Sequence, residues 1–377
     1  MAIAYGAGTY FDHTGDVGTM RATIAAFSSY LLAWSLRDGL VVPRTCPGEP
    51  HAADIRCAGL WDWCDGESVN CDDGPIDNAW YYWAVNTTAR LARSVNATRP
   101  GGELTPSDLA ELDRRIAQLR VAYDAAFWDA SCSCYRSPTH RDPNRAGATT
   151  NCTAKTDNCT LPDDRATALA IVTGLAPAHR RRAAASSVLD LGGPHSSTFS
   201  SPPMEKFAIE ALFLAGLPKA ALRRMEARFG AMATCPGLTT LWEHWEADPL
   251  TGHPVDGYNH GWSGGGLVLL SQYVAGLEPT APGWRTFRVA PRLGSLVHAA
   301  ATVATVRGTV SVDVYAPSPS VLRVKVVVPR GAVGCVELSR GREAPRRLRV
   351  TGGAAGACNL VGPGQWTVEA EFSQHSL

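Results

Sequence analysis

Apolar positions recur at helical spacing through most of the first 277 residues. After Thr105-Pro-Ser-Asp, the apolar side chains of Leu109, Leu112, Ile116, Leu119, Tyr123 and Phe127 follow one another at intervals of three and four. This spacing predicts a helix with one apolar face. Thr105 is a suitable cap, Pro106 suits the first helical position, and Asp108 completes a capping-box pattern.

Similar patterns predict further helices in the same region. They cover residues 19–36, 78–93, 164–175, 204–214, 220–229 and 262–277. In the segment 220–229, the apolar residues Leu222, Met225 and Phe229 are in register on one face. Successive pairs of helices of similar length are what a ring of helical hairpins requires.

The period of the pattern changes near residue 284. Val310, Val312 and Val314 alternate with polar residues, and the segments 321–328 and 366–372 also have strand-like patterns. Short turns rich in Gly and Pro separate these segments. We therefore predict a helical domain over residues 1–280 and a small antiparallel β-sandwich over 281–377, within which Cys335 and Cys358 are a candidate disulfide pair.

Composition and charge exclude several classes of protein. Hydrophobic residues make up 45% and charged residues 19% of the 377 positions, which is enough apolar material for a core. Lys+Arg and Asp+Glu balance at 35 each, so nothing general favours binding to nucleic acid or to an anionic membrane. The uncharged stretch 22–36 is shorter than the roughly 20 residues that span a bilayer.

The cysteines favour an oxidising, extracellular environment. Eight of the eleven lie between Cys46 and Cys159, at spacings that do not suit zinc, so we predict disulfides rather than a metal site. The same region carries four glycosylation sequons, at Asn86, Asn96, Asn151 and Asn158. Because the first residues lack both the basic and the apolar region of a signal peptide, we expect the secreted protein to begin upstream of residue 1.

The densest group of chemically active residues lies in the segments 239–245 and 258–262. They contain Glu243, His244 and His260 together with the three tryptophans Trp242, Trp245 and Trp262. A carboxylate beside aromatic rings is poorly solvated, which suits acid/base catalysis. The alternatives are a solvated glutamate beside core tryptophans, and a zinc site of Glu243, His244 and His260 without a recognisable ligand spacing.

A second group lies in the segment 60–67. Asp65 and Glu67 stand beside Trp61 and Trp63, so that carboxylates can bind sugar hydroxyls while an indole stacks on the sugar ring. The alternatives are an acidic loop held by its cysteines, and a calcium loop without an EF-hand pattern. Two acidic helix starts, 161–165 and 201–205, have the pattern of ordinary capping, although Glu205 is also placed to face the end of a barrel.

Taken together, these motifs resemble one known family, the α-L-rhamnosidases of glycoside hydrolase family 78. The matching elements occur in the family's order: Tyr10–Asp16, Leu60–Asp65, Asn78-Ala-Trp-Tyr-Tyr, Asp163-Asp-Arg-Ala-Thr-Ala-Leu-Ala, Thr240-Leu-Trp-Glu, Asn259-His-Gly-Trp, Pro282-Gly-Trp-Arg-Thr-Phe and Arg307-Gly-Thr-Val. The resemblance implies an (α/α)6 six-hairpin toroid, incomplete at its start, followed by the β-sandwich. It also implies cleavage of terminal α-L-rhamnose with inversion.

The resemblance assigns roles to individual residues. Glu243 is the expected general base, and His260 is expected to hydrogen-bond the sugar. The full set of expected substrate contacts is Trp61, Trp63, Asp65, Glu67, Asp16, Trp242, His260 and Trp262. No cofactor and no metal are implied, and the expected partners are rhamnosylated small molecules or polysaccharides.

One departure from the family pattern concerns the general acid. The family carries it in an Arg-Asp-Glu-Arg type motif before the segment matched by residue 10, and this sequence contains no such motif. Glu67 or Asp65 is a candidate substitute. The competing hypotheses are a rhamnoside-binding relative without catalysis, and another (α/α)6 glycosidase or lyase.

Overall fold

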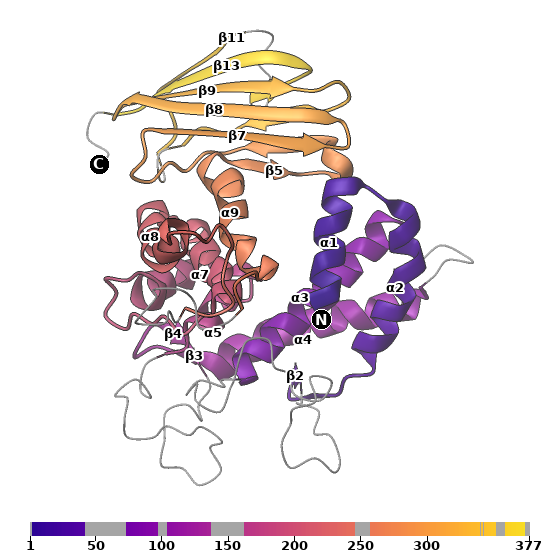
Figure 1. Cartoon of the computed structure of the whole chain (residues 1–377). Helices are drawn as coiled ribbons and strands as arrows, with labels where there is room; N and C mark the ends of the chain where they lie inside the picture. The colour runs from indigo at the N-terminus through magenta and orange to yellow at the C-terminus, as the bar shows by residue number, and fades with distance from the viewer. Residues whose placement is uncertain are drawn as a thin grey trace. The chain divides into compact units, whose positions relative to one another are not determined.

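The computed structural model describes residues 2–41, 73–96, 104–136, 162–245, 257–339, 341, 343–351 and 359–373. The chain divides into two compact units (Figure 1). The helical unit comprises Met1–Gly6 and Thr19–Gly265, and the β unit comprises Ala7–Gly18 and Gly266–Leu377. The division into domains at residue 280 stays a prediction.

Helices dominate the first part of the described chain. They are α1 (Ala2–Thr14), α2 (Val17–Leu32), α3 (Asp73–Ser94), α4 (Pro106–Phe127), α5 (Asp164–Val172), α6 (Ala178–Ala184), α7 (Pro202–Leu214), α8 (Pro218–Thr234) and α9 (Gly265–Leu269). Two short hairpins accompany them, β1 (Leu36–Arg37) with β2 (Leu40–Val41) and β3 (Trp128–Asp129) with β4 (Cys134–Tyr135).

The helical unit has an inner and an outer layer. Helices α5 and α7 are buried on nearly every side, whereas α4 and α8 each bury one face. α5 packs on α3 and α7, while α4 packs on α3 and α8 on α7. The pairs α3–α4 and α7–α8 are therefore hairpins with one inner and one outer helix, as the sequence predicts.

Helix α4 confirms the predicted capping box. The backbone N–H of Asp108 donates to Thr105 Oγ1 at 3.1 Å, and the N–H of Thr105 donates to Asp108 Oδ2 at 3.3 Å. Leu112, Leu119 and Tyr123 of the predicted stripe are fully buried. Local chemistry and burial therefore agree along this helix.

Two helix predictions are wrong in detail. The helix predicted over 19–36 ends at Leu32, because the chain then enters the β1–β2 hairpin. The helix predicted over 262–277 breaks into a 3-10 turn at Gly261–Gly264, then α9, then a π-helix at Leu270–Val274. Three consecutive glycines, 264–266, explain the first break, since glycine weakens a helix interior. Helices α1 and α6 were not predicted.

The β unit contains two sheets. The strands are β5 (Leu277–Pro279), β6 (Thr286–Val289), β7 (His298–Thr305), β8 (Gly308–Ser318), β9 (Val321–Val328), β10 (Val333–Val336), β11 (Arg347–Thr351), β12 (Leu360–Val361) and β13 (Gly364–Glu371). The five-stranded sheet has the order β11-β13-β9-β8-β7 and is antiparallel throughout, and the four-stranded sheet has the order β12-β10-β6-β5, with one parallel pair, β6 with β10. This confirms the antiparallel β domain.

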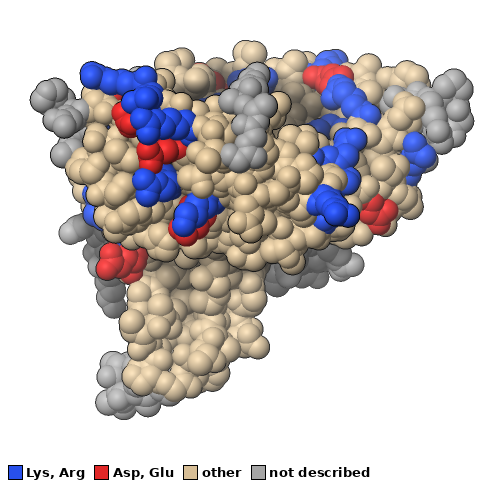
Figure 2. All heavy atoms as spheres, turned by 90° about the horizontal axis from the view of Figure 1, so that it is seen from above, with Lys and Arg blue, Asp and Glu red and all other residues tan. Residues whose placement is uncertain are grey.

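Alternation gives each long strand of the five-stranded sheet a buried and an exposed face. Val310, Val312 and Val314 are buried, as the sequence predicts. On the exposed face, Arg323 pairs with Glu369 of the neighbouring strand at 2.6 Å. Figure 2 shows acidic and basic side chains next to one another on the face that it views, which is the pattern of a solvated surface.

Among the described cysteines, Cys132 is joined to Cys134 across the β3–β4 turn. The other six members of the predicted cluster lie outside the described residues, as does Cys358, the predicted partner of Cys335. The disulfide framework therefore stays a prediction.

Candidate functional site

Two segments from the end of the helical unit lie side by side and carry the predicted catalytic residues. The N–H of Glu243 donates to the carbonyl of Gly257 at 3.0 Å, and the N–H of His260 donates to the carbonyl of Leu241 at 2.9 Å. The Thr240 hydroxyl donates to the carbonyl of Tyr258. Two stretches separated in sequence are thereby held together by backbone hydrogen bonds.

This pairing brings Glu243 and His260 together. The carboxylate Oε2 of Glu243 lies 3.7 Å from Nδ1 of His260, and each side chain is about a quarter exposed (23% and 24%). The His260 ring stacks on Trp262 at 6.3 Å between centroids, and the Trp262 side chain is exposed. Three of the predicted site residues therefore form one partly open cluster.

The second nitrogen of His260 has a different environment. Its Nε2 is buried and has no hydrogen-bond partner among the residues that the structure describes. A ring nitrogen in this state can donate to or accept from a ligand hydroxyl, depending on its tautomer.

Trp242 lies behind the cluster in the core. Only 2% of it is exposed, and its carbonyl accepts a hydrogen bond from the Ser263 hydroxyl at 2.7 Å. Trp242 thus supports the wall of the cluster from inside, whereas Trp262 presents its ring to solvent.

Trp245 fixes the end of the segment that carries Glu243. Its indole N–H donates to the carbonyl of Ser200 at 2.7 Å, and the guanidinium of Arg228 lies 4.1 Å from its ring centroid. Arg228 also donates to the carbonyl of Ser200 at 2.8 Å. A cation over an indole face is a favourable arrangement, so the segment is attached to α8 and to the loop before α7.

A buried ionic network lies beneath this attachment. Arg224 is fully buried and donates to Glu205 and Asp164, which are both fully buried as well. Nη1 of Arg224 donates to the carbonyls of Leu189 and Ser197 at 3.0 Å each. One guanidinium thereby joins α5, α7 and the loop between α6 and α7.

Charge pairing decides the ionisation of this network. Burial is the largest influence on Asp164 and on its own would raise its pKa. The positive charges of Arg224 and Arg165, together with the hydrogen bonds from Arg224 and Ser200, outweigh burial and hold that pKa below its usual value. Burial opposes the charge of Arg224 in the same way, and the carboxylates of Glu205 and Asp164 raise its pKa above the usual range. The network is therefore a set of fixed, mutually compensated charges.

Sequence reasoning missed most of this network. It assigned Asp163 to capping, which is correct, because the N–H of Arg165 donates to Asp163 Oδ1 at 2.9 Å. It did not foresee the buried Asp164. The stripe of α8 was also misplaced, because the face centred on Ala220, Ala221 and Arg224 is the buried one. The sequence did contain a sign of the buried face. Arg224 and Arg228 are one turn apart, on the same face of α8 as the small buried alanines.

The remaining predicted site residues stay predictions. Asp16 belongs to the β unit, where it accepts a hydrogen bond from the Tyr10 hydroxyl at 2.9 Å. Trp61, Trp63, Asp65 and Glu67 lie outside the described residues.

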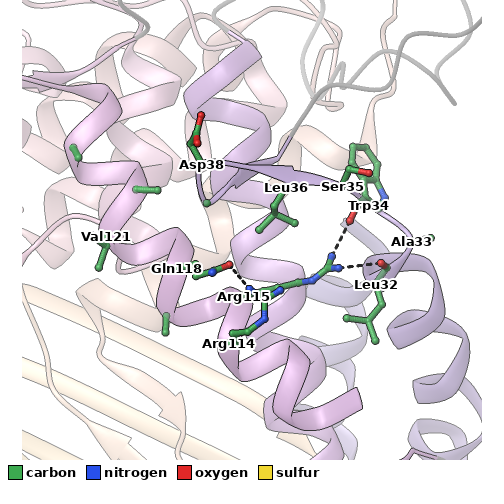
Figure 3. Close-up of a pocket in the computed structure, with 14 residues that line it drawn as sticks. Leu32, Ala33, Trp34, Ser35, Leu36, Asp38, Arg114, Arg115, Gln118 and Val121 are labelled. Carbon is green, nitrogen blue, oxygen red and sulfur yellow. Dashed lines mark hydrogen bonds between the residues drawn. The ribbon is translucent and has the colours of Figure 1, made fainter. Parts of the chain in front are cut away.

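A hollow of about 1100 Å³ lies in another part of the helical unit (Figure 3). The end of α2, the β1–β2 turn and α4 line it, including Trp34, Leu36 and Val121. Arg115 in this hollow donates to the carbonyls of Leu31 and Trp34 at 3.0 and 2.9 Å, and thereby caps α2. The hollow contains none of the predicted site residues, so we interpret the guanidinium of Arg115 as a structural group.

Two negative findings concern the described residues alone. No cluster of three His, Cys, Asp or Glu side chains among them has the arrangement of a metal site. None of the helices in the described ranges combines the length and apolar character that a membrane crossing needs.

Comparison with solved structures places the fold. Matching structures include the α-L-rhamnosidase of Dictyoglumus thermophilum (18% identity, TM-score 0.66, 95% of this chain and 38% of that chain). Another is the Streptomyces avermitilis enzyme complexed with L-rhamnose (20% identity, TM-score 0.67, 96% of this chain and 32% of that chain). A third is the Aspergillus terreus enzyme (16% identity, TM-score 0.63, 96% of this chain and 37% of that chain). At these identities the likeness shows the fold, and the chain spans only about a third of each relative. No curated protein matches the sequence.

Family models identify both parts of the chain. Residues 276–349 match the bacterial alpha-L-rhamnosidase C-terminal domain, and residues 2–274 match the bacterial alpha-L-rhamnosidase six-hairpin glycosidase domain. The second match alone covers well over half of the sequence and includes the cluster of Glu243, His260 and Trp262. The chain therefore belongs to the bacterial α-L-rhamnosidase family of six-hairpin glycosidases.

Proposed function

We propose that this chain carries the general base of an inverting α-L-rhamnosidase, and that the base is Glu243. The observation that carries the proposal is the cluster around Glu243, whose carboxylate lies 3.7 Å from His260 and is partly exposed. Family membership and the rhamnose complex of the Streptomyces avermitilis relative support rhamnose as the sugar.

In the proposed reaction, Glu243 takes a proton from a water molecule as that water attacks the anomeric carbon. A bond forms between the water oxygen and the carbon, while the bond to the leaving oxygen breaks on the opposite face of the sugar. A separate acid gives the leaving oxygen its proton. Inverting enzymes hold the two carboxyl groups roughly 6.5–9.5 Å apart to leave room for the water.

The surroundings of Glu243 suit sugar binding. The His260 ring is about a quarter exposed beside Glu243, and the exposed ring of Trp262 offers an apolar face for stacking on a sugar. We also propose Trp242 as the inner wall of this site and Trp61 and Trp63 as further sugar contacts. The substrates would be rhamnosylated small molecules or polysaccharides.

The general acid is a separate residue from the base. Within this chain we propose Asp65 or Glu67 for this role, because both carboxylates stand close to Trp61 and Trp63 in the sequence. If neither serves, residues 1–377 alone would hydrolyse only rhamnosides whose leaving group needs no protonation, since loss of an acid costs about 10²–10⁴ in rate.

Stereochemistry tests this function. Proton NMR would follow hydrolysis of 2,4-dinitrophenyl α-L-rhamnoside, whose leaving group needs no proton. β-L-rhamnose as the first product supports an inverting hydrolase, and α-L-rhamnose as the first product contradicts it. Binding of L-rhamnose in calorimetry with no turnover would instead support the rhamnoside-binding alternative, and turnover of another aryl glycoside in place of the rhamnoside would support a different glycosidase.

We further propose that the protein is secreted and glycosylated. The cysteine cluster and the four sequons support this, and Asn86 of one sequon is exposed on α3. Expression through a eukaryotic secretory route should add glycan mass that Asn86→Gln reduces, and an unchanged mass would count against glycosylation at this site.

A further inference from the structure

Gly257 lies directly against the side chain of Glu243. Its backbone has φ +59°, in the left-handed region that favours glycine. Its carbonyl accepts the hydrogen bond from the N–H of Glu243 at 3.0 Å. One residue therefore both anchors the backbone of the proposed base and borders its side chain.

The space at Gly257 is closed by Glu243 itself. A Cβ atom added to Gly257 would lie 2.5 Å from Cβ of Glu243 and 2.7 Å from its Oε2. Rotation about the side-chain bonds of Glu243 can move the carboxylate, but it cannot move Cβ, which the backbone fixes. A methyl group at position 257 would therefore have to push the two paired segments apart.

We propose that Gly257 is a positioning residue, which sets the place of the Glu243 carboxylate beside His260 through the absence of its side chain. The inference rests on the proposed role of Glu243 as the base. Its physical basis is that glycine often marks a place where another backbone approaches closely, and a Cβ at this position would lie 2.5 Å from Cβ of Glu243. Moving a catalytic group by about 1 Å can cost about 100-fold in rate.

The chain offers a matched control in Gly237. This glycine also has positive φ, +79°, and a Cβ added to it would meet no atom within 4 Å. Gly237→Ala therefore imposes the backbone strain of a left-handed alanine without the steric contact. Any larger effect of Gly257→Ala reports the contact with Glu243.

The activity arm uses the full chain and 2,4-dinitrophenyl α-L-rhamnoside. Gly257→Ala should lower kcat about 10- to 100-fold and change KM less than about threefold, whereas Gly237→Ala should change kcat less than about twofold. In the Glu243→Gln background, Gly257→Ala should cost less than about twofold more, because it acts through the base that is already lost. Equal losses of kcat from both alanine variants, or a full loss in the Gln background, would overturn the proposal.

The stability arm needs no turnover. Gly257→Ala should lower Tm more than Gly237→Ala, and at least half of that difference should disappear in the Glu243→Gly background, where the opposing Cβ is gone. An undiminished loss in that background contradicts the contact and hence the positioning role. Absence of hydrolysis by the parent chain, combined with the predicted Tm pattern, would count against the proposed function and not against the contact.

Discussion

Glu205 and Glu243 are two glutamates of the same helical unit in opposite environments. Glu205 is fully buried and is bound by the guanidiniums of Arg224 and Arg228. Glu243 is about a quarter exposed and lies 3.7 Å from the ring of His260. Glu205 is enclosed by cations and out of reach of solvent, whereas a water molecule can reach the partly exposed carboxylate of Glu243.

The two glutamates are also physically connected. Arg228 contacts both Glu205 and the ring of Trp245, and Trp245 stands two residues after Glu243. The compensated charges therefore form a rigid base beneath the segment that carries the proposed chemistry. Such support matters because a catalytic group must be held by residues that are themselves fixed. The comparison predicts that changes in the network cost stability and changes in the cluster cost activity.

Removal of Arg224 should have the largest effect on stability. Arg224→Met removes the cation that contacts the buried Asp164 and one of the two cations that contact the buried Glu205, which we expect to cost about 3–5 kcal/mol of unfolding free energy. Arg223→Met is the control, because Arg223 lies on the same helix, is largely exposed and pairs with Asp190 at the surface. Urea denaturation measures both, and equal losses would break the distinction between a buried network and a surface pair.

Acid should weaken the same network. Because the pKa of Asp164 is lowered in the folded state, its contribution is present above its unfolded pKa, about 3.9, and is lost as pH falls through the folded value. We expect Asp164→Asn to cost about 2 kcal/mol at pH 7 and progressively less below pH ~4. Urea denaturation at a series of pH values measures the difference, and a difference that grows on acidification has the wrong sign.

Arg228→Gln should have a smaller effect, because this side chain is partly exposed and its contacts are mainly with carbonyls and one indole. We expect a loss of about 1–2 kcal/mol. The fluorescence of Trp245 should also change as its cation is removed. A loss as large as that of Arg224→Met would show that Arg228 belongs to the buried network itself.

An exposed ion pair on the β unit should give the smallest loss of stability. Arg323 and Glu369 lie on the exposed face of the five-stranded sheet, 2.6 Å apart, with Arg323 about half exposed. Because such pairs are screened by solvent, Arg323→Ala should cost only about 0.2–1 kcal/mol in urea denaturation. A loss above 2 kcal/mol would mean that burial does not decide the value of ion pairs in this chain.

The sequence predicts the elements whose signals are local. The capping box at Thr105, the apolar stripe of α4 and the full extent of β9 follow from neighbouring residues alone. The break between α9 and its flanking turns depends on glycine context, and the end of α2 depends on the following hairpin. Such boundaries are set by packing that a short window of sequence does not contain.

The residues of the site also fall into those that local motifs identify and those that only distant contacts reveal. The motifs around Glu243 and His260 identify the cluster, because their residue types are unusual wherever they lie. Arg224, buried among carboxylates, reads in the sequence as an ordinary surface arginine of α8. Gly257 reads as a loop glycine, and only the paired backbone segments reveal what its missing side chain leaves room for. Contacts between distant segments therefore account for what was missed.

The turnover of Glu243→Gln with 2,4-dinitrophenyl α-L-rhamnoside tests the central claim most directly, because this leaving group isolates the base from the acid. The account predicts a fall in kcat of about 10²–10⁴-fold, since an amide cannot accept the water's proton, with L-rhamnose affinity unchanged within a few-fold. Glu226→Gln, an exposed glutamate on α8, should retain the parent rate. If Glu243→Gln keeps more than half of the parent kcat, Glu243 is not the general base.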